Sequence, residues 1–382
     1  MPFSAPTPTP GRLPAFDGLR GVAAFVVLLY HLSLIARPFL DSATPADAWW
    51  WLTRTPLKLA TAGTEAVLVF FVLSGLVVAL PALRAGFGWP SYYVGRMLRL
   101  YLPVWAALLL AATLVILFPR DSAAVTAAAW ISDSNATSIS VQRLLQEAGL
   151  WNVSYSIDNV LWSLRWEVAF SLALPFFVAA AILVRRFAFV AAGAAIAASV
   201  AGRLVDLDAL VYLPAFFLGT IFATQLPRLL RWSESRSAWF WCAAIMTSLL
   251  TLIASFLTRA FIPPGSALSA AVWGLSTAGA GGLVLCSLGS PVMIRMLSLR
   301  FPQFLGRISF SLYLVHVPLI ATLTFMLGDH RWWLVSLVGV PASLLVGWLF
   351  YRTIERPSHA LARTAARFFA ELPRPAPVPT NR

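Results

Sequence analysis

Charged side chains are scarce in this sequence: Asp, Glu, Lys and Arg make up 11% of its 382 residues. A soluble globular domain normally carries about a quarter of such residues, so the composition excludes an ordinary soluble protein. Apolar residues instead make up 59%, and the mean hydropathy is +0.79. A membrane-spanning helix needs about 20 predominantly apolar residues, and the chain holds many such runs. The sequence therefore predicts an all-α polytopic membrane protein.

Cysteine and lysine are almost absent. The two cysteines, Cys242 and Cys286, lie in or beside apolar runs, which excludes a disulfide framework and gives no metal-ligand pattern. We therefore expect no metal. The net charge is +13, but its one lysine, Lys58, and its arginines are spread over many short loops, with no basic domain. We expect no nucleic-acid partner for this reason.

Ten apolar runs predict about ten transmembrane helices in one bundle, which we place at residues 16–356. The Pro-rich tail before it, residues 1–15, lacks a cleavable signal-peptide pattern, so the first run is expected to be an uncleaved anchor. The tail after it, residues 357–382, is expected to be cytoplasmic, with an Arg- and Phe-bearing segment along the membrane surface and a disordered end. The runs are 18–36, 63–82, 98–118, 162–184, 187–202, 209–225, 238–259, 267–286, 305–327 and 332–352.

Basic residues predict the orientation of the bundle. With the N-terminus inside, the inner segments hold nineteen arginines and the outer segments hold eight basic residues. Cytoplasmic loops carry the excess of Lys and Arg in multi-pass proteins. Both termini are therefore predicted to be cytoplasmic.

The first apolar run carries an arginine and a histidine. Arg20 and His31 are eleven residues apart, so on a helix they lie within roughly 20° of one face and about 16 Å apart along the axis. Ionisable groups in a spanning helix usually line a cavity or a reaction path. The predicted topology puts Arg20 near the cytoplasmic surface and His31 in the outer half of the bilayer.

The same topology predicts two polar layers. Arg20, Arg96, Arg99 and Arg307 converge on the cytoplasmic side, and His316 lies about 13 Å outward of Arg307. The outer layer is expected to gather His31, Glu65 and Glu167. Purely structural roles also fit single residues: the positive-inside rule accounts for the arginines, a helix-start charge for Glu65, and helix packing for the segment around Ser74.

At these residues the chain resembles the membrane-bound acyltransferase-3 family. Its signature of an arginine and a histidine separated by ten residues matches FDGLRGVAAFVVLLYH, at Arg20 and His31. In two positions the chain differs from many members, with Leu68 in place of an Asp and Ser171 in place of a Tyr. The other matching blocks, in order, are GTEAVLVFFVLSG, YYVGRMLRLYLPVW, LWSLRWEVAF, FLGRISFSLYLVHVPL and IERP, over about residues 14–358.

The resemblance implies an enzyme of the bacterial cytoplasmic membrane that transfers an acyl group, commonly acetyl from acetyl-CoA, to a hydroxyl of a glycan or glycolipid. It implies catalytic roles for His31 and Glu167, with Glu167 orienting His31 or stabilising its protonated form. Residues expected to bind the acyl-CoA are Arg20, Arg96, Arg99, Arg307, Ser309, Tyr313 and His316. Residues expected to bind the acceptor are Glu65, Ser74, Trp162 and Ser163.

The sequence leaves several alternatives open. His31 can act as a general base or form a covalent acyl-histidine. The acceptor can be a small molecule such as a macrolide, or a membrane lipid. A transporter of acyl groups or lipid-linked sugars is a different class of function, which the absence of inverted repeats disfavours. The long outer loop, 119–161, is either a cover for the acceptor or a solvated connector. The oligomeric state is left open.

Overall fold

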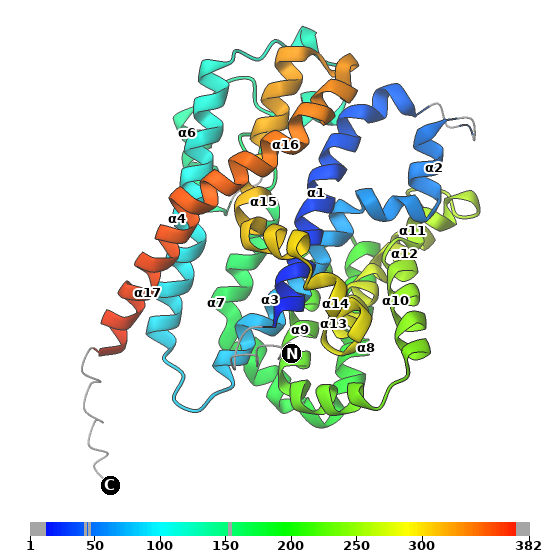
Figure 1. Cartoon of the computed structure of the whole chain (residues 1–382), viewed down its shortest axis with the longest axis vertical. Coiled ribbons are helices and arrows are strands. Elements are labelled where there is room, and N and C mark those ends of the chain that lie inside the picture. The colour runs from blue at the N-terminus through cyan, green and yellow to red at the C-terminus, as the bar shows by residue number, and fades with distance from the viewer. Residues whose placement is uncertain (1–12, 42–43, 45–46, 152–154, 372–382) are drawn as a thin grey trace, which may run out of the picture.

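The computed structural model describes residues 13–41, 44, 47–151 and 155–371, and all regular structure in these ranges is helical (Figure 1). The segment before residue 13, Asn152 of the outer loop and the end expected to be disordered, 372–382, lie outside the described residues. Nine helical stretches in this part of the chain are long and apolar enough to cross a membrane, or ten when a bent pair is counted as one span. The prediction of an all-α polytopic membrane protein is confirmed.

Every predicted span has a helical counterpart. The long helices are α1 (Pro14–Leu40), α3 (Gly63–Ala82), α4 (Trp89–Leu117), α7 (Leu161–Leu183), α8 (Ala188–Leu204), α9 (Asp208–Glu234), α15 (Arg300–Leu327) and α16 (Trp332–Phe350). Two further spans are helix pairs: α10 (Ala238–Leu252) with α11 (Ala254–Leu257), and α12 (Ala267–Gly274) with α13 (Ser276–Gly289). Short helices are α2 (Ala48–Arg54), α5 (Trp130–Asp133), α6 (Val141–Gly149), α14 (Pro291–Leu297) and α17 (Arg356–Glu371). The 3₁₀ turns are Pro56–Thr61, Ser122–Ala124, Arg185–Phe187, Thr258–Ala260 and Asp329–Arg331.

The span predicted at 238–259 is bent rather than straight. The chain turns by 66° between α10 and the segment Ala254–Ala260. Sharp kinks usually occur at Pro or Gly, and residues 245–260 contain neither. The bend therefore has no local sequence signal, and it redirects Phe256 and Arg259 toward α1 and α3, where they line a pocket described below.

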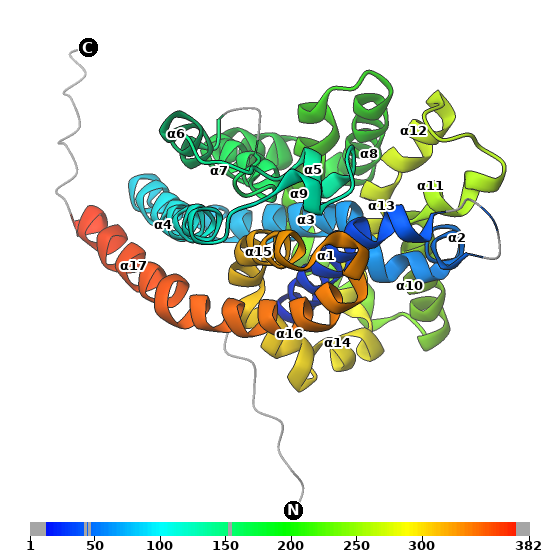
Figure 2. The same cartoon turned by 90° about the horizontal axis from the view of Figure 1, so that it is seen from above.

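The last span continues well past its predicted end at 352. One helical stretch runs over 329–370, so the boundary expected at 356 falls within continuous helix. A π-helical turn, Tyr351–Glu355, joins α16 to α17. Such a turn shifts the register of the backbone hydrogen bonds, and it ends two residues before Pro357, which lacks the N–H that a regular α-helix would use there. The helix α17 packs along α4 (Figures 1 and 2).

At the centre of the bundle, α1 packs closely against α15 and also contacts α3 (Figure 2). Glycines allow the close approach of α1 and α15: a Cβ added at Gly306 would collide with the backbone carbonyl of Asp17, and one added at Gly21 would collide with the backbone of Gly306. Small residues at helix crossings are typical of membrane bundles. This contact fixes the relative height of α1 and α15, which carry His31 and His316.

We expect Gly306→Ala to destabilise the protein by about 1–3 kcal/mol, because the added methyl group overpacks the crossing. The matched control is Gly193→Ala in α8, where a Cβ has nothing within 4 Å. That change should be neutral or stabilise by about 0.5–1 kcal/mol. Intrinsic tryptophan fluorescence during thermal unfolding in detergent measures both. An unchanged midpoint of thermal unfolding for Gly306→Ala would show that the crossing of α1 and α15 accommodates the added methyl group.

The outer loop 119–161 is folded onto the bundle and is not a solvated connector. Ile131 packs with Ala321 and Phe325 of α15. The Glu147 carboxylate accepts hydrogen bonds from the backbone N–H groups of residues 156, 157 and 158 at 2.7–3.0 Å. Asp158 is fully buried, and burial raises the pKa of its carboxyl well above the usual range. The loop therefore closes one end of the bundle.

Candidate active site

An inner cavity of about 630 Å³ lies between α1, α3, α4, α7, α15 and α17. This volume is within the range of small-molecule sites, about 300–1,000 Å³. We call it inner because its arginines lie in segments that the basic-residue pattern assigns to the cytoplasmic side. The arginines along its wall are Arg20, Arg96, Arg99, Arg307 and Arg363.

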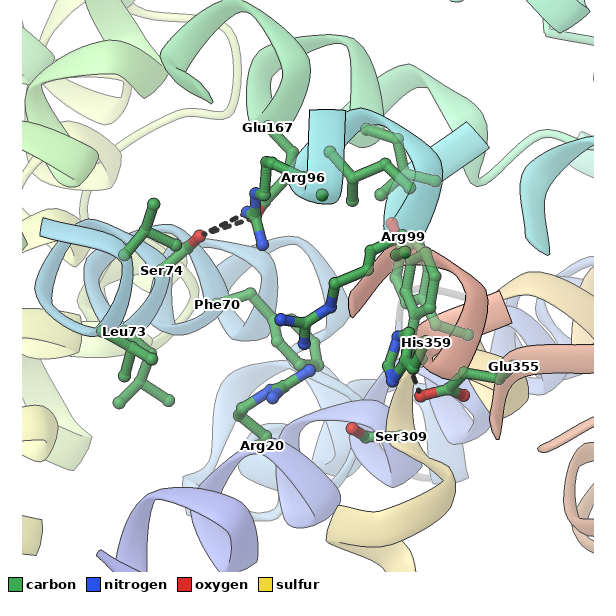
Figure 3. A pocket seen from close by; sticks show the side chains of 18 of the residues that line it. Arg20, Phe70, Leu73, Ser74, Arg96, Arg99, Glu167, Ser309, Glu355 and His359 are labelled. Carbon is green, nitrogen blue, oxygen red and sulfur yellow. Dashed lines mark hydrogen bonds and ion pairs between the residues drawn. The ribbon is translucent and has the colours of Figure 1, made fainter. Parts of the chain in front are cut away.

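The inner cavity has an excess of positive charge, because its five arginines share the lining with three carboxylates, Asp17, Glu167 and Glu355. Figure 3 shows the guanidinium groups of Arg20 and Arg99 turned toward the same space. Arg96 forms an ion pair with Glu167, but no carboxylate oxygen of the described chain lies within 4.0 Å of Arg20, Arg99 or Arg307. Guanidinium groups match phosphate oxygens well. The cavity is therefore suited to a polyanionic ligand.

Glu167 does not lie in the outer layer, where the sequence analysis expected it. Its carboxylate accepts from the Arg96 guanidinium and from Ser74 Oγ at 2.5 Å. Arg96 Nε also donates to Ser171 Oγ at 3.1 Å. Ser171, which stands where many family members have a tyrosine, therefore binds the same guanidinium group as Glu167. The prediction that Glu167 orients His31 is wrong on this geometry.

The reason for this error is the starting height of α7. Val160 and Leu161 are fully buried, and Ser163 Oγ lies 2.6 Å from Tyr313 Oη. Because Tyr313 is about 20 Å along α15 from its inner end, α7 begins inside the bundle. Glu167 is about 10 Å further inward than Val160, and Arg96 is about 10 Å along α4 from its inner end. Glu167 and Arg96 therefore lie at a similar depth in the bundle.

His31 pairs instead with His316 on α15. His31 Nδ1 lies 3.0 Å from His316 Nε2 and 3.0 Å from the Val27 carbonyl oxygen. His316 Nδ1 lies 2.9 Å from the Leu312 carbonyl oxygen. Both side chains are buried. His316, expected to bind the acyl-CoA, thus directly contacts the residue expected to perform catalysis.

The hydrogen bonds of this pair define its tautomers. A carbonyl oxygen only accepts, so His316 Nδ1–H must donate to Leu312. The Val27 carbonyl oxygen likewise only accepts, so His31 Nδ1 carries a proton, which it shares between Val27 and His316 Nε2. This leaves the lone pair on His31 Nε2, which has no hydrogen-bond partner in the described part of the chain. An imidazole nitrogen in this state can take a proton.

Aromatic rings surround the histidine pair. Trp130 of the outer loop lies 5.1 Å from His31 between ring centroids, and Tyr313 lies 6.0 Å from His316. Tyr313 and Phe70, whose rings are 5.9 Å apart, also line the inner cavity. The cavity therefore ends at aromatic side chains directly beside the pair.

Three residues that the sequence analysis did not select also line the inner cavity: Glu355, His359 and Arg363. Glu355 accepts from the backbone N–H of Ser311 at 3.1 Å and from Ser311 Oγ at 2.5 Å, so it ties the π-helical turn to α15. The IERP block contained a signal for Glu355. Arg363 was expected in a surface segment, and only the packing of α17 on α4 brings it to the cavity.

The predicted site residues lie in four places. Glu65 lines a second pocket, of about 300 Å³, together with Tyr30 and Lys58, and we call this the outer pocket. His31 and His316 lie between the two spaces, and Trp162 packs against Tyr212, with ring centroids 5.3 Å apart. The predicted residues that line the inner cavity are Arg20, Ser74, Arg96, Arg99, Ser163, Glu167, Arg307, Ser309 and Tyr313.

Comparison with known proteins bears on the chemistry of this site. A family model described as an acyltransferase domain, Acyl_transf_3, matches residues 13–352. No curated protein and no solved structure matches the chain. The matched segment contains both members of the histidine pair and nearly all of the inner cavity. The chain is thus a member of the acyltransferase-3 family, a multi-pass membrane enzyme that transfers acyl groups.

Proposed function

We propose that this acyltransferase moves an acetyl group from cytoplasmic acetyl-CoA to a hydroxyl of a glycan or glycolipid, in the cytoplasmic membrane of a bacterium. The observation that carries the proposal is the position of the histidine pair. It lies between a cationic inner cavity and a second pocket at the opposite end of α1 and α3.

The inner cavity is proposed to hold the CoA moiety. CoA carries its negative charge on a 3′-phosphate and a pyrophosphate, and Arg20, Arg99 and Arg307 offer guanidinium groups without a carboxylate partner in the described chain. Arg96 is paired with Glu167 and forms part of the cavity wall beside these three arginines. The thioester end would reach about 16 Å from the level of Arg20 to that of His31, past Phe70 and Tyr313.

His31 Nε2 is proposed to be the general base. It takes the proton of the acceptor hydroxyl as that oxygen attacks the thioester carbonyl carbon. The new C–O bond forms, the C–S bond breaks, and the proton ends on the departing thiolate, which leaves as free CoA. The Val27 carbonyl oxygen and His316 together hold the reactive tautomer of His31, and His316 shares the positive charge of the protonated state through the Nδ1–H hydrogen bond.

Acceptor-dependent release of free CoA tests the proposal. Purified protein with acetyl-CoA should release CoA when a glycan acceptor is supplied, and an ester should form on the glycan. A transporter would bind or move its cargo without consuming the thioester. Consumption that is independent of any acceptor would indicate hydrolysis and would contradict the group transfer.

The arrangement of the two pockets predicts sidedness. In sealed vesicles of known orientation, acetyl-CoA on the face of the inner cavity should acetylate an impermeant acceptor on the opposite face. Initial rates should fall to background, at least about tenfold, when acetyl-CoA is supplied only on the acceptor side. Detergent-opened vesicles are the control, since there the side of addition is irrelevant. Product formed only when both substrates share the inner face would exclude transfer across the bilayer.

A further inference from the structure

The outer pocket adjoins the histidine pair from the side away from the inner cavity. On α1, Tyr30 and Arg37 line the outer pocket, whereas Arg20 lines the inner cavity. On α3, Glu65 lines the outer pocket and Val67 the inner cavity, about 3 Å apart along the axis. The Tyr30 ring lies 5.2 Å from the His31 ring between centroids. The two spaces thus lie on different sides of α3 and at different heights along α1, with Tyr30 of the outer pocket in contact with His31.

The outer pocket has an excess of positive charge. Its lining carries four cations, Arg37, Arg54, Lys58 and Arg259, and two carboxylates. Arg37 is paired with Asp41 at 3.2 Å, and Glu65 accepts from Trp273 Nε1 at 2.8 Å. Across the residues that the structure describes, no carboxylate oxygen lies within 4.0 Å of the other three cations.

Lys58 is the most enclosed of these cations. Its side chain is 4% exposed, and Nζ donates to the Thr61 carbonyl oxygen at 2.8 Å. An ammonium group has three donors, so two stay available. The ammonium also lies 4.1 Å from the centroid of the Phe256 ring, which the bend after α10 brings into the pocket. The Glu65 carboxylate of the same pocket compensates this charge in part, without an ion pair within 4.0 Å. Burial of an ammonium that lacks a direct carboxylate contact is costly, and a bound anion would offset this cost.

Aromatic rings form much of the remaining wall. Trp49, Trp50 and Trp273 line the pocket, and the guanidinium of Arg54 lies 5.9 Å from the Trp50 centroid. Flat aromatic faces give dispersion contacts to a sugar ring, and charged groups beside them bind an attached anion. The lining therefore combines the two surfaces that a sugar phosphate needs.

We infer that the outer pocket binds the acceptor through a phosphate ester carried on its sugar. The inference rests on the proposed function, since it names the chemistry of the acceptor that His31 would acylate. A phospholipid headgroup offers the same phosphate, but it does not account for the aromatic wall or for the position beside His31. The phosphate would lie among Lys58, Arg54 and Arg259, and the sugar against the tryptophan rings.

Binding of glucose 1-phosphate tests the inference in the absence of acyl-CoA. Equilibrium dialysis of the full chain in non-ionic detergent should show binding of the labelled sugar phosphate, and at least tenfold weaker binding of glucose. Lys58→Met should weaken sugar-phosphate binding by roughly 10- to 150-fold, and Arg259→Gln should also weaken it. Arg331→Gln is the matched control, because it removes an exposed cation from the same face outside the pocket.

The pH dependence isolates Lys58. Burial lowers the pKa of Lys58 to about 8, so its charge, and the affinity that depends on it, is present at pH 7 and lost as the pH rises to 9. The arginines stay charged over this range, and the phosphate keeps its charge because its second pKa is about 6. Tyr30, Asp41 and Glu65 are the other titratable groups facing Lys58. Lys58→Arg leaves them in place and should retain binding at pH 9.

Two outcomes would overturn the inference. Equal binding of glucose and glucose 1-phosphate, or unchanged binding in both Lys58→Met and Arg259→Gln, would exclude a phosphate site. Binding that is present in detergent but lost in phospholipid nanodiscs would assign the pocket to a headgroup. If sugar phosphate does not bind but CoA release with a neutral glycan persists, the inference alone fails and the proposed acyl transfer stands.

Discussion

Replacement of His31 by Gln is expected to lower acceptor-dependent CoA release by about 10²- to 10⁴-fold, the usual contribution of a general base. The physical reason is the free lone pair on Nε2, which follows because the proton of His31 lies on Nδ1, between the Val27 carbonyl oxygen and His316. The amide of Gln retains polarity and much of the volume but cannot take the proton. Acyl-CoA affinity should stay within a few-fold of the wild type, because His31 lies outside the inner cavity lining.

Two further histidine variants give this expectation its controls. His330→Gln changes an exposed histidine outside both pockets and should leave turnover unchanged. His316→Gln removes one of the two acceptors of the His31 Nδ1–H and leaves the Val27 carbonyl oxygen, so it should lower the rate less than His31→Gln and shift the pH profile of turnover. If His31→Gln turns over like the wild type, His31 is not the base, and the pair serves only packing.

Replacement of Arg20 or Arg99 by Gln is expected to weaken acyl-CoA binding by roughly 10- to 150-fold each, since one charge-assisted contact contributes about 1.5–3 kcal/mol. Both guanidinium groups line the inner cavity and lack a carboxylate within 4.0 Å in the described residues. Isothermal titration calorimetry with acetyl-CoA measures the loss directly. Acceptor binding, measured separately, should change little.

The matched control for these arginines is Arg295→Gln. Arg295 is exposed, lies in a predicted cytoplasmic segment and does not line the inner cavity. Loss of Arg295 tests whether positive charge on the cytoplasmic side is enough by itself to support acetyl-CoA binding. Dephospho-CoA thioesters lack the 3′-phosphate. Their affinity should therefore differ less between the wild type and whichever variant has lost the 3′-phosphate contact. Equal acetyl-CoA affinity in Arg20→Gln, Arg99→Gln and the wild type would mean that both arginines only anchor the topology.

Local features of the sequence determined the class of the protein and most of its helices. Hydropathy is a property of each run of about 20 residues, and the predicted span 63–82 coincides with α3, Gly63–Ala82. The separation of Arg20 and His31 along one face follows from helix geometry alone. The motif blocks selected four of the five arginines that line the inner cavity, and the family match over residues 13–352 confirmed the enzyme class.

Tertiary structure decided which polar groups meet. Hydropathy predicts that every span starts at a membrane surface, but α7 starts inside the bundle, so Glu167 pairs with Arg96 and not with His31. The partner of His31 is 285 residues away in sequence, and its height is set by the close packing of α1 on α15, which Gly21 and Gly306 allow. The bend after α10 and the continuation of α16 into α17 brought Arg259 and Arg363 to the two pockets. Hydropathy and spacing describe one helix at a time, whereas the site is made by contacts between helices, and those depend on packing across the whole bundle.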